Sequence, residues 1–252
     1  MKALADLFDS YSRRARLYPA LLVVLPLLMY LLPQLPGLTT AKGQPAWVGL
    51  MWPVLVTAGV PFLLVTLVRS RGKATQHRLL ADWDGFSSTR ALRHRDTGSP
   101  QRREHRRQRL QERLGVQLPT AAEEEQDPIG ADEHYQLAVE QLIARVRAQS
   151  DIFPLVAEEN AHYGFRRNLL GVKPVALSVL AACLVADLAL ISGTVPIASR
   201  ALPTGQPLTA LVLAVHAAML LGWAAQVCPV WVQEAADDYT TRLYAALDDP
   251  RL

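Results

Sequence analysis

Cysteine is scarce in this chain, and paired-cysteine motifs are missing from it. The 252 residues include two cysteines, Cys183 and Cys228. A helical interpretation of the surrounding sequence puts them at different depths, whereas a disulfide needs Cα atoms within about 7 Å of each other. We therefore expect two packing cysteines and no disulfide. The sequence also lacks an H-E-x-x-H pattern, so it predicts no metal site and no cofactor.

Complete catalytic signatures are missing as well, although three short matches occur. Gly72-Lys73 lacks the upstream glycine of a phosphate-binding loop, and it follows an apolar segment instead of a strand. His94-Arg95-Asp96 lacks the downstream asparagine of a kinase catalytic loop. Asp82-Trp83-Asp84-Gly85 offers two carboxylates, which is too few ligands for a divalent cation and is typical of a turn. We therefore predict no catalytic residue.

Charge is nearly absent from four long apolar stretches, which are the most informative feature of the sequence. They cover residues 18–35, 47–68, 172–191 and 208–230. The first two contain no charged residue, the third contains Lys173 and Asp187, and the fourth contains only His216. A helix rises about 1.5 Å per residue, so each stretch is long enough to cross a bilayer core of about 30 Å. The sequence predicts an all-α integral membrane protein with four transmembrane helices in two hairpins.

Basic residues flank these stretches mainly on one side. Thirteen lysines and arginines lie near the stretch ends that face the two termini and the middle of the chain, whereas the two hairpin loops hold only Lys42 and Arg200. Positive charge accumulates on the cytoplasmic side of a membrane. We therefore predict a bacterial inner (plasma) membrane protein with both termini in the cytoplasm. Its expected parts are a cytoplasmic interfacial helix at 1–17, a transmembrane hairpin at 18–68, a cytoplasmic insert at 69–165, a second transmembrane hairpin at 166–230 and a cytoplasmic tail helix at 231–252.

The predicted insert is polarised in charge and helical in pattern. Residues 69–113 hold thirteen basic and five acidic residues, a net charge of +8, and residues 114–165 hold two basic and ten acidic residues, a net charge of −8. Thr120 and Glu123 fit a helix capping box, and Gly115 fits a helix stop. Apolar residues recur at helical spacing further along the acidic half. We expect a mostly helical insert, and the sequence leaves open whether it is compact.

Nine arginines in the basic half are candidates for binding an anionic ligand or lipid headgroups. Three interpretations stay open: a solvated face that pairs with the acidic half or with anionic lipid, a docking surface for a nucleotide, and a surface for a protein partner. Nucleic acid is disfavoured because the aromatic residues that would stack on bases are sparse. The nine are Arg90, Arg93, Arg95, Arg102, Arg103, Arg106, Arg107, Arg109 and Arg113.

A second candidate surface combines two aromatic rings with two arginines. Tyr163, Phe165, Arg166 and Arg167 lie just before the third apolar stretch. Aromatic and basic side chains favour the headgroup level of a bilayer, so these residues are candidates for a membrane-interface anchor. Local packing is the alternative.

Two ionisable residues lie inside the second predicted hairpin. Counted from the hairpin loop, Asp187 and His216 lie roughly 9 and 12 Å below the outer membrane boundary. We expect the two side chains to meet, because an unpaired carboxylate inside the membrane costs on the order of 3 kcal/mol. The pair acts either as a staple that fixes the hairpin register or as a proton- or ion-responsive pair, since histidine titrates near neutral pH.

Small residues recur at every fourth position in the same hairpin. Such stripes let helices approach closely in lipid. We expect them to pack inside the hairpin or to form the contact of a homo-oligomer. They are Ser178, Ala182 and Ala186 in the third stretch, and Ala210, Ala214, Ala218 and Gly222 in the fourth.

Three segments carry a resemblance to known proteins. Residues 92–96 (LRHRD), 118–120 (LPT) and 158–168 (EENAHYGFRRN) resemble a group of uncharacterised bacterial four-span membrane proteins, which implies a membrane location without a particular activity. The layout of two spans, an insert and two more spans is also similar to membrane effectors of bacterial defence systems, where the insert would receive a signal and the spans would perturb the membrane. This second likeness is architectural and covers no motif.

Together these features predict a non-enzymatic membrane effector or channel-like component whose insert senses a ligand or a partner. A membrane anchor or accessory scaffold for a cytoplasmic partner is the alternative. An intramembrane enzyme, which would have to use Asp187, His216 or the Asp82/Asp84 carboxylates, is a third. The expected partner is membrane lipid, and a homo-oligomer, a cytoplasmic protein and a nucleotide ligand stay open.

Overall fold

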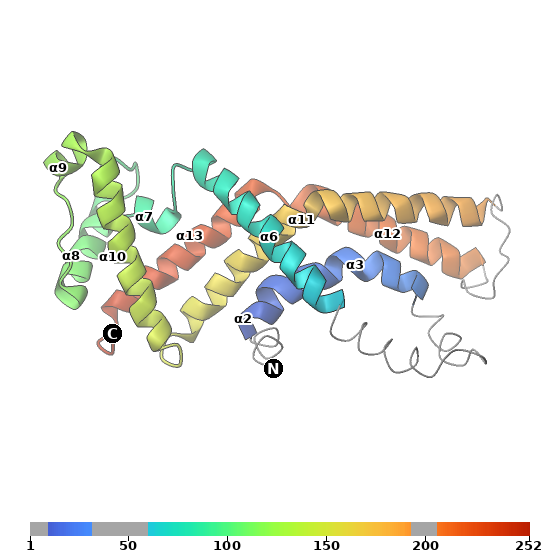
Figure 1. The fold of residues 1–252 in the computed structure, drawn as a ribbon, viewed down its shortest axis with the longest axis horizontal. Helices are drawn as coiled ribbons and strands as arrows, with labels where there is room; N and C mark the ends of the chain where they lie inside the picture. Colours follow the sequence, from blue (N-terminus) through green and yellow to red (C-terminus); the bar gives the residue numbers. More distant parts are fainter. Residues whose placement is uncertain (1–9, 32–59, 193–205) are drawn as a thin grey trace. The chain divides into compact units, whose positions relative to one another are not determined.

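The computed structural model describes residues 10–31, 60–192 and 206–252 (Figure 1). These residues are helical and contain no β-strand, which confirms for them the all-α class predicted from the sequence. The longer helices are α3 (Tyr18–Leu31), α6 (Val60–Asp82), α8 (Pro100–Leu114), α10 (Pro128–Ala148), α11 (Pro154–Ile191), α12 (Gln206–Gln226) and α13 (Pro229–Ala245). The shorter ones are α2 (Ser10–Ser12), the π-helix η1 (Arg13–Leu17), α7 (Ser87–Arg90), α9 (Ala121–Gln126) and the 3-10 helix η4 (Ala246–Asp248).

The chain divides into two compact units. Unit 1 comprises Met1–Thr75 and Phe165–Cys228, and unit 2 comprises Gln76–Gly164 and Pro229–Leu252. Unit 2 therefore combines most of the predicted insert with the segment that we expected to form a separate tail helix. The two units are described in turn.

Helix boundaries in unit 2 follow local sequence signals. Thr120 and Glu123 form a complete capping box at the start of α9, as predicted. Gly115 ends α8 with a φ of 66°, a left-handed conformation that glycine adopts without strain, and this prediction is also confirmed. Asp127 caps α10 by accepting a hydrogen bond from the Gly130 N–H, and Pro128 occupies the first turn.

A hydrophobic core holds unit 2 together, so the insert is compact. Figure 1 shows α7, α8, α10 and α13 gathered in this part of the chain. The last residue, Leu252, is buried in the same core, and its carbonyl oxygen accepts a hydrogen bond from Arg145 Nε at 2.8 Å. The core residues include Leu92, Leu110, Tyr135, Val139, Leu142, Val146, Phe153, Leu243, Tyr244 and Leu247.

Helices α6 and α11 approach closely in unit 1, where two glycines leave room for the backbone. A Cβ atom at Gly171 would lie 2.8 Å from the backbone of Arg71 and Gly72, and a Cβ atom at Gly72 would lie 1.8 Å from Asn168 Oδ1. Asn168 is fully buried, and its Nδ2 donates a hydrogen bond to the Ala15 carbonyl at 2.5 Å. These contacts join η1, α6 and α11.

The outer surface of unit 1 is apolar. Of the seventeen exposed large apolar side chains in the described ranges, twelve belong to unit 1, including Val185, Leu211 and Leu221. Isolated exposed apolar residues are ordinary in soluble proteins, whereas exposed apolar residues concentrated over the helices of one unit are compatible with a membrane protein.

One described helix, α11, is long and apolar enough to cross a membrane, and only 22% of its most apolar 18-residue window is buried. A second candidate exists if Ala210–Gln226 and Pro229–Asp248 form one broken span. The predicted spans at 18–35 and 47–68 lie partly outside the described residues, as does most of the interfacial helix at 1–17. The helical model with one or two apolar candidate spans is compatible with a membrane protein, and the number of four spans stays a prediction.

Candidate functional site

A buried polar pair joins α11 and α12 in unit 1. Both helices run side by side in Figure 1. Asp187 on α11 and His216 on α12 each have 0% of their surface exposed, and His216 Nδ1 lies 2.7 Å from Asp187 Oδ2. The predicted meeting of these two side chains is therefore confirmed. Each group provides the polar partner that the other needs in an apolar setting.

The buried face around this pair is built mostly from side chains larger than alanine. On α11 it includes Val172, Ala176, Leu180 and Cys183, which recur three or four positions apart, and on α12 it includes Val212 and Trp223. Cys183 belongs to this face, and neither Cys183 nor Cys228 forms a disulfide, as predicted.

The small-residue stripes lie outside this face, so the described structure does not show the packing inside the hairpin that was one of the two alternatives. A homo-oligomer contact, the other alternative, stays a prediction. Successive residues of a helix are about 100° apart, which puts Ala186 about 100° from Asp187, and Ala214 and Ala218 about 160° from His216. The pair therefore turns the stripes away from the α11–α12 contact. The exposed stripe residues are Ser178, Ala182, Ala186, Ala210, Ala214, Ala218 and Gly222.

Lys173 stabilises the end of α12. Its Nζ donates hydrogen bonds to the carbonyl oxygens of Ala224, at 3.0 Å, and Val227, at 2.7 Å. The last carbonyls of a helix lack intrahelical partners and carry partial negative charge, so an ammonium group there satisfies both needs. Lys173, Asp187 and His216, which interrupt the third and fourth apolar stretches of the sequence, therefore each have a hydrogen-bond partner in unit 1.

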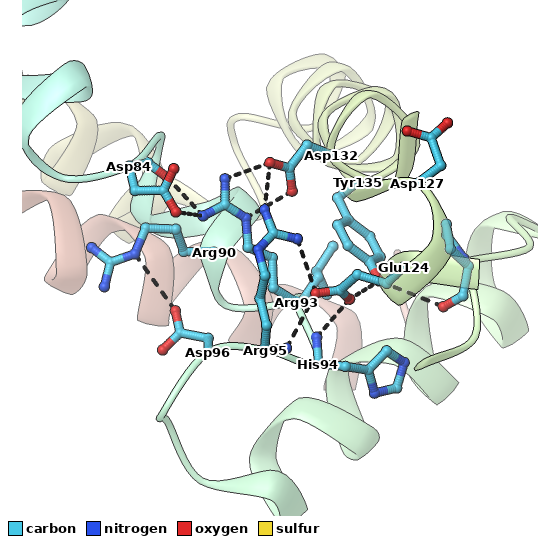
Figure 2. A network of polar contacts seen from close by, with 12 residues as sticks. Asp84, Arg90, Arg93, His94, Arg95, Asp96, Glu124, Asp127, Asp132 and Tyr135 are labelled. Atoms are coloured by element: carbon cyan, nitrogen blue, oxygen red, sulfur yellow. Dashed lines mark hydrogen bonds and ion pairs between the residues drawn. The ribbon is translucent and has the colours of Figure 1, made fainter. Parts of the chain in front are cut away.

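A second polar site lies in unit 2, where Arg93 joins three segments (Figure 2). Arg93 is 4% exposed. Its Nε and Nη2 donate to the two carboxylate oxygens of Asp132 on α10 at 2.7 Å, and its Nη1 donates to the carbonyl and carboxylate oxygens of Asp84 at 2.7 Å. Bidentate arginine–carboxylate pairs of this kind are strong and directional.

Glu124 is the buried acceptor of the same network. It is 2% exposed, and it accepts hydrogen bonds from the N–H groups of His94 (2.7 Å) and Arg95 (3.1 Å), from Arg95 Nη1 (2.9 Å) and from the Tyr135 hydroxyl (2.6 Å). Burial by itself raises the pKa of Glu124, but these hydrogen bonds outweigh burial and lower the pKa to about 2. Burial and the bond to Glu124 raise the pKa of Tyr135 to about 12.

Two further arginines bind main-chain oxygens around this network. Arg107 donates to the Leu92 carbonyl at 3.1 Å and to the Pro119 carbonyl, and its guanidinium lies 5.5 Å from the centre of the Tyr135 ring. Arg103 donates to the carbonyl oxygens of Arg93 and Asp96. Segments 92–96 and 118–120, which carry part of the resemblance noted above, thus meet in one cluster.

These contacts divide the nine candidate anion-binding arginines. Arg93 and Arg107 are taken up by internal partners, so the structure does not present them as a ligand surface. Arg95 binds Glu124 and Asp132, and Arg109 binds Glu112 and Asp248. Pairing between the basic and acidic halves, which was one of the open interpretations, is therefore seen for Arg93 and Arg95. Arg90, Arg102, Arg103 and Arg106 line one cavity, and Arg113 lies at the end of α8.

The Asp82–Gly85 segment forms a turn, as expected. Asp84 has a φ of 56° and Gly85 a φ of 102°, and the Asp84 carboxylate is bound by Arg93. Within the described residues no group of three or more histidine, cysteine, aspartate or glutamate side chains is arranged to hold a metal ion.

The four candidate anchor residues differ in exposure. Tyr163 is buried, while Phe165, Arg166 and Arg167 are half-buried. Burial of the tyrosine ring favours local packing for this residue, which was the stated alternative.

Sequence reasoning missed several residues that build unit 1. Asn168 was noted only as part of the resemblance, Gly72 only as a failed phosphate-loop match, and Gly171 not at all. A signal existed for Gly72 and Gly171, because a glycine inside a helical apolar pattern often marks a close backbone approach. Their partners depend on how α6 and α11 pack, which one sequence does not reveal.

Comparison with protein-family models, with curated proteins and with solved structures finds no match. No relative therefore supplies an activity, and the geometry of these two sites has to indicate the function.

Proposed function

We propose that this protein is an integral inner-membrane protein with four helical spans and cytoplasmic termini, acting as a non-enzymatic membrane effector or channel-like component. Unit 2 is its cytoplasmic part and senses a ligand or a partner. Unit 1 responds in the membrane through the Asp187–His216 pair.

The exposed apolar surface of unit 1 supports the membrane location. In water, side chains such as Val185, 68% exposed, and Leu221, 69% exposed, would forgo about 25 cal/mol for each Å² of apolar surface left in contact with solvent. Lipid removes this cost, since acyl chains are as apolar as the side chains. A surface of this kind over helices that bury a polar pair is the pattern of a membrane bundle.

The Asp187–His216 pair is the observation that carries the effector hypothesis. Ionisable residues within membrane segments are rare, face the bundle interior, and mark ion or proton pathways by default. Histidine is the side chain whose charge changes most readily near neutral pH. A histidine in direct hydrogen-bond contact with a carboxylate at 2.7 Å can release one proton and so convert an imidazolium–carboxylate ion pair, with no net charge, into a neutral imidazole beside a carboxylate, with a net charge of −1; uptake of a proton reverses the change.

Ion flux from proteoliposomes tests this proposal. The full chain is reconstituted in phosphatidylcholine–phosphatidylglycerol vesicles, and dissipation of a proton or potassium gradient is followed with dyes between pH 5 and pH 8. We expect flux that changes across the titration range of histidine and falls at least tenfold in Asp187→Asn and His216→Gln.

Leu188→Ala is the matched control, because Leu188 is the next residue of α11 and its side chain is exposed. We expect this variant to keep wild-type flux. Wild-type flux in both pair variants, or no flux from the wild-type protein at any pH, would overturn the effector hypothesis.

The scaffold alternative is favoured by one feature of unit 2. Ile129 and Leu137, eight positions apart on α10, are 77% and 57% exposed, as expected of a helix that presents apolar side chains to a partner. A protein that co-purifies with the wild-type chain and is lost in Ile129→Ser, together with an absence of flux, would favour this function.

A further inference from the structure

Unit 2 contains a cavity lined by four arginines. The cavity measures about 380 Å³, within the range of small-molecule sites. Its walls come from the segment 87–99, the start of α8 and the middle of α13. The arginines are Arg90, Arg102, Arg103 and Arg106.

Two of these arginines are already engaged. Arg90 Nε lies 3.5 Å from Asp96 Oδ2, and Arg103 Nη1 donates to main-chain oxygens, including that of Asp96 at 2.9 Å. Asp96 and Asp237 are the two acidic residues that line the cavity, so its charged lining has an excess of two positive charges.

The other two arginines carry this excess. Among the described residues, neither Arg102 nor Arg106 forms an ion pair with a carboxylate. Arg106 is half-buried, with its guanidinium 4.9 Å from the centre of the Tyr244 ring. Tyr244 is itself fixed, because its hydroxyl donates to the Ser88 carbonyl at 2.7 Å. This hydrogen bond holds in place the ring against which Arg106 lies.

The cavity holds like charges close together. Burial lowers the pKa of Arg106, and the nearby positive charge of Arg102 lowers it further. An anion between the two guanidiniums would relieve this repulsion and accept charge-assisted hydrogen bonds from both. Planar guanidinium groups match the oxygens of a phosphate in geometry as well as in charge.

A hydrogen-bonding group in the same lining points to a ligand with oxygen atoms. The Ser87 hydroxyl is buried and has no hydrogen-bond partner among the described residues, although it borders the cavity. A buried hydroxyl without a partner costs free energy, and a ligand oxygen would satisfy it. The first turn of α8 also lines the cavity, and its helix dipole adds to the positive potential there.

We infer that this cavity binds a phosphate monoester, with Arg102 and Arg106 contacting the phosphate oxygens. The inference rests on the proposed function, because it names the chemistry that the cytoplasmic unit would sense. It also narrows nine candidate arginines to the four of one cavity. A soluble phosphorylated molecule and a lipid with a phosphate monoester headgroup share this chemistry.

The first test is titration of the full chain, held in phosphatidylcholine nanodiscs, with inorganic phosphate and with inorganic pyrophosphate by calorimetry. We expect saturable binding that weakens at least tenfold in Arg102→Gln and in Arg106→Gln. Arg102 is exposed, and its side chain forms no hydrogen bond or ion pair with the described residues, so we expect this variant to fold and its loss of affinity to report on binding.

Arg242→Gln is the matched control. Arg242 lies on α13 next to the cavity residue Thr241 but is exposed and does not line the cavity, so the variant makes the same charge change nearby. We expect it to bind both probes as the wild-type protein does. An equal loss in Arg242→Gln, or no saturable binding to the wild-type protein, would overturn the inference.

Nanodiscs that contain phosphatidic acid separate the two sources of phosphate. If the headgroup of this lipid occupies the cavity, the soluble probes will bind at least tenfold more weakly than in phosphatidylcholine, and Arg102→Gln will remove the difference. Equal affinity in both nanodiscs assigns the site to a soluble compound. Either result supports a phosphate site.

The same experiment separates this inference from the proposed function. Asp187→Asn should bind phosphate normally even though it loses flux. Phosphate binding without ion flux in the wild-type protein would support the phosphate site and contradict the effector function. Ion flux without phosphate binding would support the effector function and contradict the phosphate site.

Discussion

The two units of this protein are built on opposite distributions of polarity. Unit 2 buries an apolar core around Tyr135 and Leu142 and keeps its charges in a network of ion pairs at the edge of that core. Unit 1 exposes large apolar side chains such as Val185 and buries Asp187 and His216 between helices. Both are all-helical in the part of the chain that the structure describes. Helical content therefore says little about the medium around each unit.

The buried polar groups have a different structural role in each unit. In unit 2 the buried charges fix the turn after α6 and the segment 92–96 against α9 and α10, where no regular hydrogen-bond ladder would do so. In unit 1 the Asp187–His216 pair lies between buried apolar side chains of α11 and α12. Loss of polar groups should therefore affect stability strongly in unit 2 and activity strongly in unit 1.

The largest expected effect on stability is at Glu124. Glu124→Ala removes the acceptor of two main-chain N–H groups and of the Tyr135 hydroxyl, and it takes from Arg95 one of its two carboxylate partners. Removal of one partner from a buried ionic network costs about 3–5 kcal/mol. Denaturant unfolding of the full chain in detergent, followed by hydrogen exchange in residues 84–140, measures the loss. Glu125→Ala, at the exposed neighbour, should change the free energy of unfolding by less than about 0.5 kcal/mol. Equal effects would contradict the account.

Acid should destabilise unit 2 by a comparable amount. The pKa of Glu124 falls from 4.5 to about 2 on folding. A carboxylate with a lowered pKa stabilises the fold fully above pH 4.5, and this contribution is lost as the pH falls from 4.5 to about 2. The loss in the free energy of unfolding is about 3 kcal/mol. As the pH is lowered, hydrogen exchange should become faster in unit 2 before it does so in unit 1.

Tyr135→Phe sharpens the pH prediction. It removes the 2.6 Å hydrogen bond that helps to lower the pKa of Glu124, so the loss of stability in acid should be smaller than in the wild-type protein and should be complete at a higher pH. A loss of the same size over the same pH range would show that this hydrogen bond does not lower the pKa of Glu124.

Two glycines test the packing of unit 1. In Gly171→Ala the new Cβ would lie 2.8 Å from the backbone of α6, and overpacking of this kind costs about 1–3 kcal/mol. In Gly222→Ala the new Cβ meets no described atom within 4 Å, so stability should stay the same or rise by up to about 1 kcal/mol because alanine favours a helix. Thermal unfolding in detergent compares the two, and a larger loss at Gly222 would contradict the packing described.

The smallest expected effect on stability is at the polar pair. Asp187→Ala should cost only about 1–2 kcal/mol, because hydrogen bonds between membrane helices are worth little more than this against an unfolded state that also finds partners. Unfolding in mixed detergent measures it. A loss as large as that of Glu124→Ala would mean that the pair serves the fold and not a pathway.

The sequence predicted most of the local structure and part of each site. Apolar spacing and capping residues predicted where helices begin and end. The capping signals of Thr120, Glu123 and Gly115 could be read from the sequence because each acts within its own helical turn. Counting residues from the hairpin loop predicted that Asp187 and His216 lie at similar depths, because a hairpin sets which residues of its two helices face each other.

Partners between segments distant in the chain were not predictable in the same way. The sequence predicted Arg93 to be part of a basic surface, but its guanidinium hydrogen-bonds to Asp132, which is thirty-nine residues away in the sequence. The small-residue stripes are exposed, and the sequence alone could not decide between packing inside the hairpin and a contact between copies of the chain. The contribution of Leu243 and Leu252 to the core of unit 2 depends on tertiary packing that no local pattern encodes.

We propose that lipid surrounds unit 1 and water surrounds unit 2, and the accessibility of spin labels is the most direct measurement of this difference. In a Cys183→Ala, Cys228→Ala background reconstituted in liposomes, single labels are placed at Val185→Cys and Ile129→Cys, two sites of similar exposure. We expect the label at residue 185 to collide with oxygen more often than with a water-soluble nickel complex. We expect the label at residue 129 to collide more often with the nickel complex. Strong collision of the label at 185 with the nickel complex would contradict it.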